Sequence, residues 1–584
     1  MVTINWINNK NIGNKVSMLE FINKDASSIR GIFFKLISNF GNFNILNKPL
    51  YAHFIYKNIQ SMWIMSLIHE KSHYKSKYLD DILKIIAFKK YIEKENPNEI
   101  LLENSNSKTF KTLKKYCNLN NIKLNQKNSI NKTESKIYEF LPNFVKAITW
   151  IIKIYFDHSK LKIKKNPAKN SEIFICSYFS HLKNDKIKKG NYSSEYWDGL
   201  AEIFISNNIK VEWVHHFIKT KITPNTKTAN NILNSINAKE NNSHNFITSH
   251  LSFRLLLKII LGYVNFRFQT LLVRTSFENI FYFDGIDFKE FFKNDFKKSI
   301  YGIVAIENIM WIEIFNKLLK ELPKQKLGIY LQENQGWEYA FINAWKNNGH
   351  GKLLAVQHSS VAYWDMRYLN SFDSKLFLKS KQFKPDFFSV NGDLSKKQFL
   401  KFEYPKQEII DLEALRYRNI KKLSIVEKTS KKILILGDIS YSITSNLLKI
   451  IYPIVRNGYK WYFKSHPIKN YEIDKDFKKH IIELHKPLNQ LISDFDTIIC
   501  SDSSTVSIES LMSGLKTIIV NSNAKLNRSA LKDEKAINFV NTTEDINKSL
   551  SSYNNYNSSR NYFYQSEDLY RWNKLLERLN IVKI

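Results

Sequence analysis

A histidine and a group of hydroxyl residues follow two apolar runs in the C-terminal third of the chain. His466-Pro467 comes shortly after the run Trp461–Phe463, and Ser503-Ser504-Thr505 follows the run Thr497–Cys500. A histidine can donate a hydrogen bond to a phosphate oxygen or protonate a leaving group. Hydroxyl groups at the start of a helix, together with its first N–H groups, bind anions. Each motif alone is also typical of an ordinary turn or helix cap, but the pair predicts a phosphate-binding site.

Other polar residues of the same region fit this ligand. Glu509 lies one turn into the helix expected at Thr505–Ser513, where its carboxylate could accept hydrogen bonds from ribose hydroxyl groups. Asp438 follows the apolar run Ile433–Leu436. We therefore predict a nucleotide-binding set that consists of Asp438, Lys464, Ser465, His466, Pro467, Ser503, Ser504, Thr505 and Glu509.

A second group of polar residues follows two apolar runs near the middle of the chain. Gln332-Glu333-Asn334 comes after Leu327–Leu331, and Gln357-His358-Ser359 closes and follows the run that begins at Leu353. The residue types include a carboxylate and an imidazole, which can move protons. We predict catalytic roles for Glu333 and His358, and we predict that Gln332, Gln357 and Ser359 bind substrate.

Short apolar strands that alternate with helices must position both groups. Strands are predicted at Ile173–Ser177, Lys210–His215, Leu327–Leu331, Leu353–Gln357, Asp386–Val390, Ile433–Leu436, Trp461–Phe463, Thr497–Cys500 and Thr517–Val520, with helices between them at Tyr196–Ser206, Trp337–Asn347, Ser445–Val455 and Thr505–Ser513. This alternation is typical of parallel, doubly wound sheets, which bind ligands outside the carboxyl ends of their strands. Two such blocks, separated by the polar connection near Lys421–Lys431, predict an α/β fold with two facing Rossmann-like domains.

The predicted domains are a mixed α/β region at 1–165, a Rossmann-like domain at 166–398, a second one at 399–560 and a C-terminal helix at 561–584. In the first region we expect a helical stretch over Tyr51–Glu93, a strand at Glu99–Leu102, a helix near Lys108–Cys117 and a loop over Asn125–Lys136. The polar segment Lys219–Asn245 is also expected to be a loop.

Two apolar helices that carry basic residues are expected at Phe144–Phe156 and Leu251–Val273. In the first, lysines at 146, 153 and 160 share one face because they recur every seven residues. Basic amphipathic helices can lie in a membrane interface. Buried helices that flank a sheet, with their lysines reaching solvent, explain the same pattern.

The chain of 584 residues has 88 Lys and Arg against 54 Asp and Glu, a net charge of +34. Such a charge suits nucleic acid, an anionic membrane surface or an anionic substrate. It also accords with the residue bias of an AT-rich genome, because Lys, Asn and Ile abound while Gly and Pro are scarce. We favour nucleic acid least, because the chain has no zinc-finger spacing, RNP-like motif or arginine-rich tract.

Several further features concern the location of the protein and the need for cofactors. The cysteines, Cys117, Cys176 and Cys500, lie far apart, which favours a reducing compartment. The first residues lack the basic start and apolar run of a signal peptide, and no apolar run of about 18 residues predicts a spanning helix. Asp284-Gly285-Ile286-Asp287 is an imperfect metal motif that we interpret as a turn. We therefore expect a cytoplasmic protein, peripheral at most to the membrane, with no metal and no cofactor.

The segments Lys464-Ser465-His466-Pro467 and Asp502-Ser503-Ser504-Thr505 resemble the His-Pro and Ser-Ser/Thr motif pair of bacterial GT-B sialyltransferases and Kdo transferases, which use CMP-sugars. The stretch from Gln332 to Glu338, with Gly349-His350-Gly351 and Gln357-His358-Ser359, is similar to a family of surface carbohydrate biosynthesis proteins. In that family the pattern continues through Tyr363-Trp364-Asp365 and Arg367-Tyr368. The resemblance covers roughly residues 170–520.

This resemblance implies a metal-independent glycosyltransferase that builds a surface polysaccharide such as lipopolysaccharide or capsule. The domain at 166–398 would bind a glycan or lipid-linked acceptor, and the domain at 399–560 would bind the CMP-sugar. In GT-B sialyltransferases the base is part of an acidic pair followed by glycine, whereas this chain has Gln332-Glu333 without that glycine. The resemblance implies Glu333 as the base, with His358 as the second candidate and His466 and the serines on the donor phosphate.

Two other functions fit the sequence. A glycerol- or ribitol-phosphate transferase that uses a CDP-polyol shares the GT-B scaffold, a basic-proline motif and serines. A non-enzymatic basic protein that binds a membrane or a nucleic acid would account for the charge alone. Nucleic-acid binding of that kind would weaken steeply as salt is raised.

Overall fold

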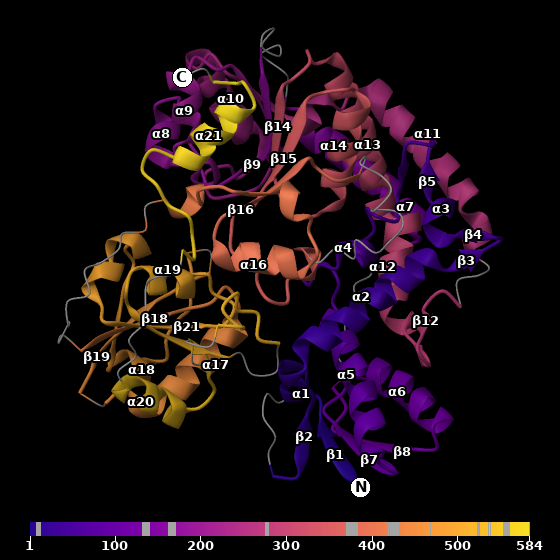
Figure 1. The fold of residues 1–584 in the computed structure, drawn as a ribbon, viewed down its shortest axis with the longest axis vertical. Coiled ribbons are helices and arrows are strands. Elements are labelled where there is room, and N and C mark those ends of the chain that lie inside the picture. Colours follow the sequence, from indigo (N-terminus) through magenta and orange to yellow (C-terminus); the bar gives the residue numbers. More distant parts are fainter. Residues whose placement is uncertain are drawn as a thin grey trace.

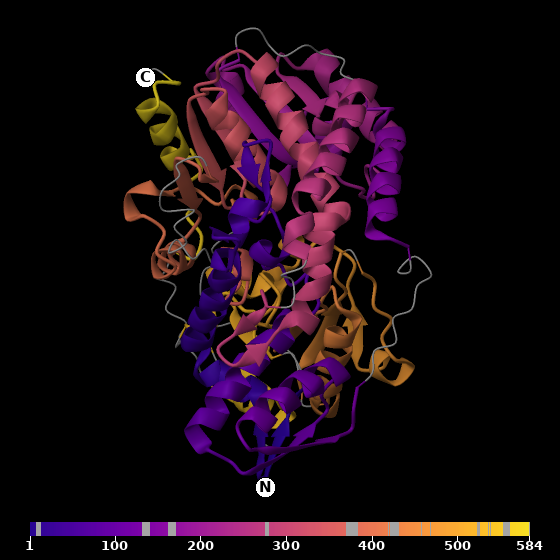
Figure 2. The same cartoon turned by 90° about the vertical axis from the view of Figure 1, so that its right-hand side faces the viewer.

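The computed structural model describes all residues except 8–12, 131–140, 162–170, 275–278, 369–382, 419, 421–430, 457, 468, 522–525, 535–536, 538, 553–560 and 583–584. Most of the predicted connection at Lys421–Lys431 therefore lies outside the described residues. The N-terminal sheet and the C-terminus occupy opposite ends of the long axis (Figures 1 and 2).

Two large parallel sheets form two lobes (Figure 1). The first lobe holds seven strands, β9 (Ile173–Phe179), β10 (Val211–Phe217), β11 (Ser243–Phe246), β14 (Leu327–Leu331), β15 (Lys352–Val356), β16 (Phe387–Val390) and β17 (Ile409–Asp411). The second lobe holds six, β18 (Lys432–Leu436), β19 (Lys460–Lys464), β20 (Ile481–Glu483), β21 (Thr497–Ser501), β22 (Lys516–Val520) and β23 (Phe539–Val540). All nine predicted strands are present, and the α/β class with two Rossmann-like domains is confirmed.

Both sheets are doubly wound, with one point where the strand order reverses. The first sheet has the order β11-β10-β9-β14-β15-β16-β17, so its order reverses between β9 and β14. The second has the order β20-β19-β18-β21-β22-β23, so its order reverses between β18 and β21. At such a point the chain leaves the sheet in opposite directions and opens a crevice for a ligand.

The strands of the first lobe are buried on both faces because helices cover each side. Phe174 and Cys176 of β9 pack in one apolar core, while Ile173 and Ile175 pack in another, as the alternation of a strand requires. The helices of this lobe are α7 (Asn143–His158), α8 (Asn184–Lys188), α9 (Leu200–Ser206), α10 (Thr226–Lys239), α11 (Phe253–Gln269), α12 (Lys289–Tyr301), α13 (Ile303–Glu321), α14 (Gly336–Asn347) and α16 (Asp393–Lys401). The second lobe adds α17 (Tyr441–Ile451), α18 (Lys475–Lys478), α19 (Val506–Met512) and α20 (Thr543–Ser551).

The N-terminal region forms a third, smaller parallel sheet with the order β2-β1-β7-β8. Its strands are β1 (Val2–Asn5), β2 (Lys15–Ser17), β7 (Glu99–Glu103) and β8 (Lys123–Lys127), and its helices are α1 (Met18–Lys24), α2 (Ala26–Asn42), α3 (Leu50–His53), α4 (Leu67–Glu70), α5 (Leu79–Glu95) and α6 (Ser107–Leu119). Two small hairpins join them, β3 (Asn44–Ile45) with β4 (Lys48–Pro49) and β5 (Ile55–Tyr56) with β6 (Gln60–Ser61). One continuous core joins this region to the first lobe, because Phe33 and Phe40 of α2 share it with Phe341 of α14.

Three local expectations were wrong. The stretch Tyr51–Glu93 is not one helix, because Lys57 and Asn58 take left-handed backbone angles in the β5–β6 turn and Lys71 ends α4. The segment Lys219–Asn245 is not a loop, because Asn225 caps α10 and β11 follows it. Asn125 to Lys127 complete strand β8, and residues 131–136 lie outside the described part.

One other expectation was confirmed. Asp284 and Gly285, both with positive φ, form the turn between β12 (Tyr282–Phe283) and β13 (Ile286–Asp287). Gly514, with φ of +74°, follows α19 in the left-handed conformation typical of a helix end.

The chain crosses between the lobes twice. β17 pairs with β16, so we place the change of sheet after Asp411 instead of at residue 399. The last helix, α21 (Tyr570–Arg578), returns to the first lobe, where Trp572 is fully buried in the core that also holds Trp197. The Glu413 carboxylate accepts hydrogen bonds from the backbone N–H groups of Arg571 and Trp572 at 2.9 and 3.2 Å, which holds the start of this helix.

We expect Trp572→Ala to lower the free energy of unfolding by about 3–5 kcal/mol, because it empties a large buried site. Tyr570→Ala, on the same helix but 57% exposed, is the matched control and should change it little. Urea unfolding followed by circular dichroism measures both. Equal effects of the two substitutions would show that α21 does not anchor the first lobe.

Candidate functional site

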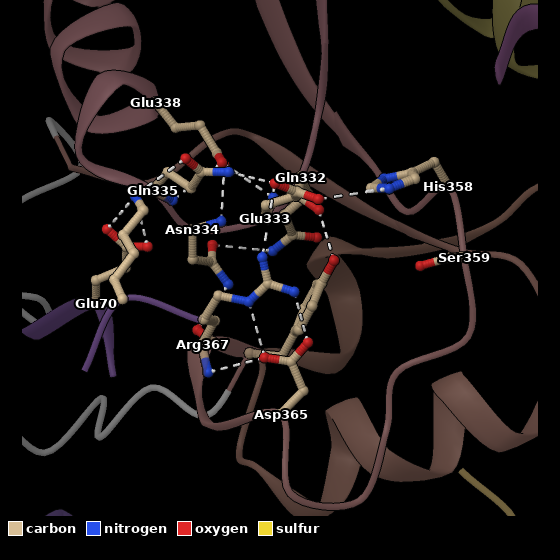
Figure 3. Close-up of polar contacts among 12 residues, drawn as sticks. Glu70, Gln332, Glu333, Asn334, Gln335, Glu338, His358, Ser359, Asp365 and Arg367 are labelled. Carbon is tan, nitrogen blue, oxygen red and sulfur yellow. Dashed lines mark hydrogen bonds and ion pairs between the residues drawn. The ribbon is translucent and has the colours of Figure 1, made fainter. Parts of the chain in front are cut away.

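Glu333 and His358, the two candidate bases, face each other across neighbouring strand ends of the first lobe (Figure 3). Glu333 follows β14, His358 follows β15, and their Oε1 and Nε2 atoms are 3.6 Å apart. The Glu333 side chain is 21% exposed and that of His358 8%. Both therefore stand at the edge of the sheet, next to the strand-order reversal between β9 and β14.

A buried carboxyl group fixes the turn that presents Glu333. Glu338, in the first turn of α14, accepts hydrogen bonds from the backbone N–H groups of Glu333, Asn334 and Gln335, each at 3.0 Å. Asn334 takes a left-handed φ of +56°, so the chain turns sharply after β14. Burial raises the pKa of Glu338 to about 8. This group therefore shapes the turn and leaves Glu333 as the accessible carboxyl.

Arg367 binds the other side of Glu333. Its guanidinium makes a bidentate ion pair with Asp365, at 2.9 and 2.7 Å, and its Nη1 lies 3.6 Å from Glu333 Oε2. Although burial opposes ionisation, Arg367 holds the pKa of the Asp365 carboxyl below its ordinary value. Bidentate pairs of this kind are geometrically specific, so Arg367 positions the Glu333 carboxylate.

His358 is neutral at physiological pH. Burial, reinforced by the positive charges of Arg416 and Arg367, lowers its pKa to about 3. The ring packs edge-on against Tyr196 with centroids 5.0 Å apart, and its Nδ1 has no hydrogen-bond partner among the described residues. A neutral imidazole can accept one hydrogen bond and donate another. The single N–H of His358 can therefore point from Nε2 toward Glu333, which leaves Nδ1 as a hydrogen-bond acceptor for a ligand.

Residues of the N-terminal region also reach this site. Lys75 Nζ lies 2.8 Å from the Glu70 carboxylate and 3.3 Å from the side-chain oxygen of Gln335 (Figure 3 shows Glu70 beside Gln335). The ring of Tyr74, 83% exposed, lies 5.6 Å from the Arg367 guanidinium. Neither the residue types nor the spacing of this segment indicated a role in the site.

The other predicted residues of the first lobe make hydrogen bonds within the chain. Gln332 donates to Asn334 at 3.3 Å, and its backbone oxygen accepts from Tyr368 at 2.6 Å. Gln357 donates to Ser395 and to the backbone oxygen of Ser359. Their geometry supports the strand-end loops, and their predicted contact with substrate stays a prediction.

In the second lobe Asp438 binds the hydroxyl groups that follow β21. Its Oδ2 accepts hydrogen bonds from Ser501 at 2.6 Å and from Ser503 at 2.5 Å. The cluster bridges the ends of β18 and β21, where the strand order of this sheet reverses. Ser503 therefore turns toward Asp438 and not toward α19, and Thr505, the N-cap residue of that seven-residue helix, makes no side-chain capping bond.

The remaining residues of the predicted nucleotide-binding set lie around this cluster. Burial lowers the pKa of His466, while the nearby Asp438 charge opposes that shift. Burial also lowers the pKa of the half-buried Lys464. Ser465 accepts a hydrogen bond from the backbone of Tyr471 at 3.1 Å, Pro467 is exposed, and Ser504 is half-buried. His466 and Lys464 therefore stand at the end of β19, on the other side of β18 from the serines.

Glu509 and Arg416 connect the two groups of residues. Burial raises the pKa of Glu509 to about 7, and the charge of Arg416 opposes that rise. The Arg416 guanidinium lies 5.7 Å from the ring of Tyr196, which packs on His358, and its charge acts on both His358 and Glu509. Its place in an irregular connection gave no signal in the sequence.

No group of three or more His, Cys, Asp or Glu residues in the described part of the chain is arranged to hold a metal ion. No helix in the same part of the chain has the length and apolar content needed to cross a membrane.

No protein-family model matches the chain, and no curated protein does. Among solved structures, it is similar to trehalose 6-phosphate synthase from Burkholderia multivorans, with 11% identity, a TM-score of 0.37 and coverage of 70% of this chain and 96% of that one. It is also similar to MurG from Acinetobacter baumannii, with 10% identity, a TM-score of 0.36 and coverage of 70% and 100%. The values for UDP-GlcNAc 2-epimerase from Neisseria meningitidis are 11%, 0.35, 70% and 94%. At these TM-scores the likenesses carry no functional conclusion.

We expect the His358 imidazole to stay neutral from pH 8 down to pH 5. Histidine ¹³C NMR spectra, assigned with His358→Gln, measure its protonation. Arg416→Ala removes one cause of the low pKa, so it should raise that pKa while burial keeps it below 6.5. Protonation of wild-type His358 near pH 6.5 would contradict this electrostatic description.

Proposed function

We propose that the chain is an inverting glycosyltransferase that moves a sugar from a nucleotide donor to a glycan or lipid-linked acceptor. The observation that carries the proposal is the placement of two complementary groups. Glu333 and the neutral His358 lie beside the point where the strand order of the first sheet reverses. Asp438, its bound serines and His466 lie beside the corresponding point of the second sheet. Ligands of doubly wound sheets bind at these points.

In this reaction Glu333 takes the proton of the acceptor hydroxyl as its oxygen attacks the anomeric carbon. The bond between that carbon and the donor phosphate oxygen breaks, and the nucleotide leaves with the bonding electrons. Glu333 suits the role better than His358, because its carboxylate is the more exposed and a histidine with a pKa of about 3 is a weak base. His466 and Lys464 would stabilise the leaving phosphate.

We further propose a CMP-activated acidic sugar, of the nonulosonate or Kdo type, as the donor for a surface polysaccharide. The motifs Lys464–Pro467 and Asp502–Thr505 support this choice, since they follow β19 and β21, the strands on either side of β18. Arg416, which makes no ion pair with any described residue, supplies positive charge for a sugar carboxylate.

Transfer activity tests the proposal. The purified protein is incubated with CMP-Kdo, a CMP-nonulosonate, UDP- and GDP-sugars or CDP-glycerol, and release of the nucleotide is measured. We expect release from a CMP-sugar, and Glu333→Gln should slow it about 10²–10⁴-fold, the usual contribution of a general base, with CMP binding retained.

Glu321→Gln, at an exposed position at the end of α13, is the matched control for that substitution. Full activity of Glu333→Gln would contradict the role of Glu333 as the general base. Turnover of UDP- or GDP-sugars alone would overturn the CMP assignment, and turnover of CDP-glycerol alone would identify a polyol-phosphate transferase.

We also propose peripheral binding to an anionic membrane through helices α7 and α11. The helices lie side by side, with Phe144 stacked on Tyr263 at 5.9 Å and Tyr155 edge-on to Phe253 at 6.3 Å. Exposed apolar side chains cover this α7–α11 face: Phe144, Val145, Ile152, Phe156, Phe253, Leu257, Leu261 and Phe268.

Polar residues of α11 flank these apolar side chains, and Arg254, Lys258, Asn265 and Gln269 are themselves exposed. Lys258 pairs with Glu313 at 2.6 Å, and Gly262 packs against the hydroxyl of Tyr56. The exposed Lys153 and Arg254 add positive charge beside the apolar residues. An apolar surface with basic residues around it suits the interface of an anionic bilayer.

Flotation with vesicles of phosphatidylglycerol and phosphatidylethanolamine tests this binding. We expect Phe156→Asp with Leu261→Asp to weaken it at least tenfold, because each change removes a large apolar side chain from the interface. Ile482→Asp, at an exposed apolar position in the second lobe, is the control. Dimerisation through this face without flotation would show that a second copy, and not a membrane, covers it.

A further inference from the structure

Arg416 occupies the crossing between the two lobes. Its neighbour Leu415 packs in a core of the first lobe, and Tyr417, on its other side, packs in a core of the second lobe, stacked on Phe563 at 4.0 Å. The residue between them must therefore lie where the lobes meet.

The guanidinium of Arg416 is half-buried, yet it makes no hydrogen bond or ion pair with any described residue. The rings of Tyr196 and Tyr417 lie 5.7 and 5.8 Å from it. All other described arginines that are not exposed have an acceptor: Arg30 with Tyr363, Arg267 with Tyr301, Arg367 with Asp365, Arg418 with Glu567, Arg528 with Asp80 and Arg571 with Glu413. A partly desolvated guanidinium without an acceptor is costly and suits a planar or tetrahedral anion.

Two further polar atoms close to Arg416 lack a partner within the described part of the chain. They are the hydroxyl oxygen of Tyr417 and Nδ1 of His358, and the Tyr417 residue as a whole is 5% exposed. Tyr196 joins the groups, because its ring contacts both the Arg416 guanidinium and the His358 ring. A ligand with anionic oxygens could accept hydrogen bonds from the guanidinium and from the tyrosine hydroxyl.

We propose that Arg416, with Tyr417, binds an anionic oxygen group of the ligand, either the donor phosphate or the carboxylate of an acidic sugar. The inference deepens the proposed function, since it assigns the residue that would hold the charge of the donor between the lobes. Two carboxylates lie near enough to influence this site. The charge of Arg416 acts on both Glu195 and Glu509, and Glu509 is the less exposed of the two.

Calorimetry on the full chain tests the site. Inorganic pyrophosphate represents the donor phosphate, free Kdo represents the carboxylate of an acidic sugar, and the binding of each is measured separately. We expect wild-type protein to bind at least one of them. Arg416→Ala should weaken that binding about tenfold to a hundredfold, and Arg416→Lys, which keeps the charge but loses the fork, should weaken it less.

Arg418→Ala is the matched control, because it removes an arginine two residues away whose guanidinium donates to the Glu567 backbone oxygen on the surface. Glu509→Gln removes a competing carboxylate and should tighten binding at pH 8, above the pKa of about 7, and change it little at pH 6. If Arg416→Ala does not fold, Arg416→Lys and Glu509→Gln decide the question.

No binding of either anion by the wild type, or binding equal in wild type and Arg416→Ala, would overturn the inference. If the protein binds pyrophosphate through Arg416 but transfers no sugar, the anion site is supported and the proposed function is contradicted. If sugar transfer is equally fast in wild type and Arg416→Ala, the proposed function is supported and the role of Arg416 is contradicted.

Discussion

The parallel pairing of the strands is the constraint on which the rest of this molecule depends. A parallel strand needs a crossover before the next one, so the carboxyl ends of all strands in a sheet come to one edge. In the first lobe this brings together Glu333 and His358, and in the second it brings Asp438 to Ser501 and Ser503. The reversal of strand order then leaves one place in each sheet where helices diverge and a ligand can approach the backbone.

Alternating charges organise the first-lobe side of this region. Asp365 binds Arg367, Arg367 lies beside Glu333, and Glu333 faces the neutral His358. In a partly buried environment each charge needs a partner, because an isolated one would lose much of its solvation free energy. Glu338 solves the same problem differently: it accepts three backbone hydrogen bonds, and burial favours its neutral form. The site can therefore hold several ionisable groups while leaving Glu333 partly accessible.

The sequence predicted the strands well because each is a short apolar run with polar residues after it. It therefore also placed Glu333, His358, Asp438 and the serines at strand ends. It could not predict which polar residues bind one another, since Ser503 looks like a helix cap and in fact binds Asp438. Arg416 was missed because its importance comes from the crossing of the chain between lobes, which no local pattern encodes. Helix α10 was missed because its apolar stripe, formed by Ala229, Leu233 and Ile236, is narrow in a polar segment.

The N-terminal region was the part least accessible to sequence reasoning, and it contacts both lobes. It shares a continuous core with the first lobe, and Lys75 brings its charge to Gln335 beside Glu333. Toward the second lobe, Arg528 lies 3.4 Å from Asp80, and His73 lies 3.1 Å from the same carboxylate. Burial works against ionisation of Asp80, but His73 and Arg528 outweigh it and hold its pKa below the ordinary value. An ionised, half-buried Asp80 links the N-terminal region to the second lobe, so relative movement of the lobes has to break this contact or carry the N-terminal region along.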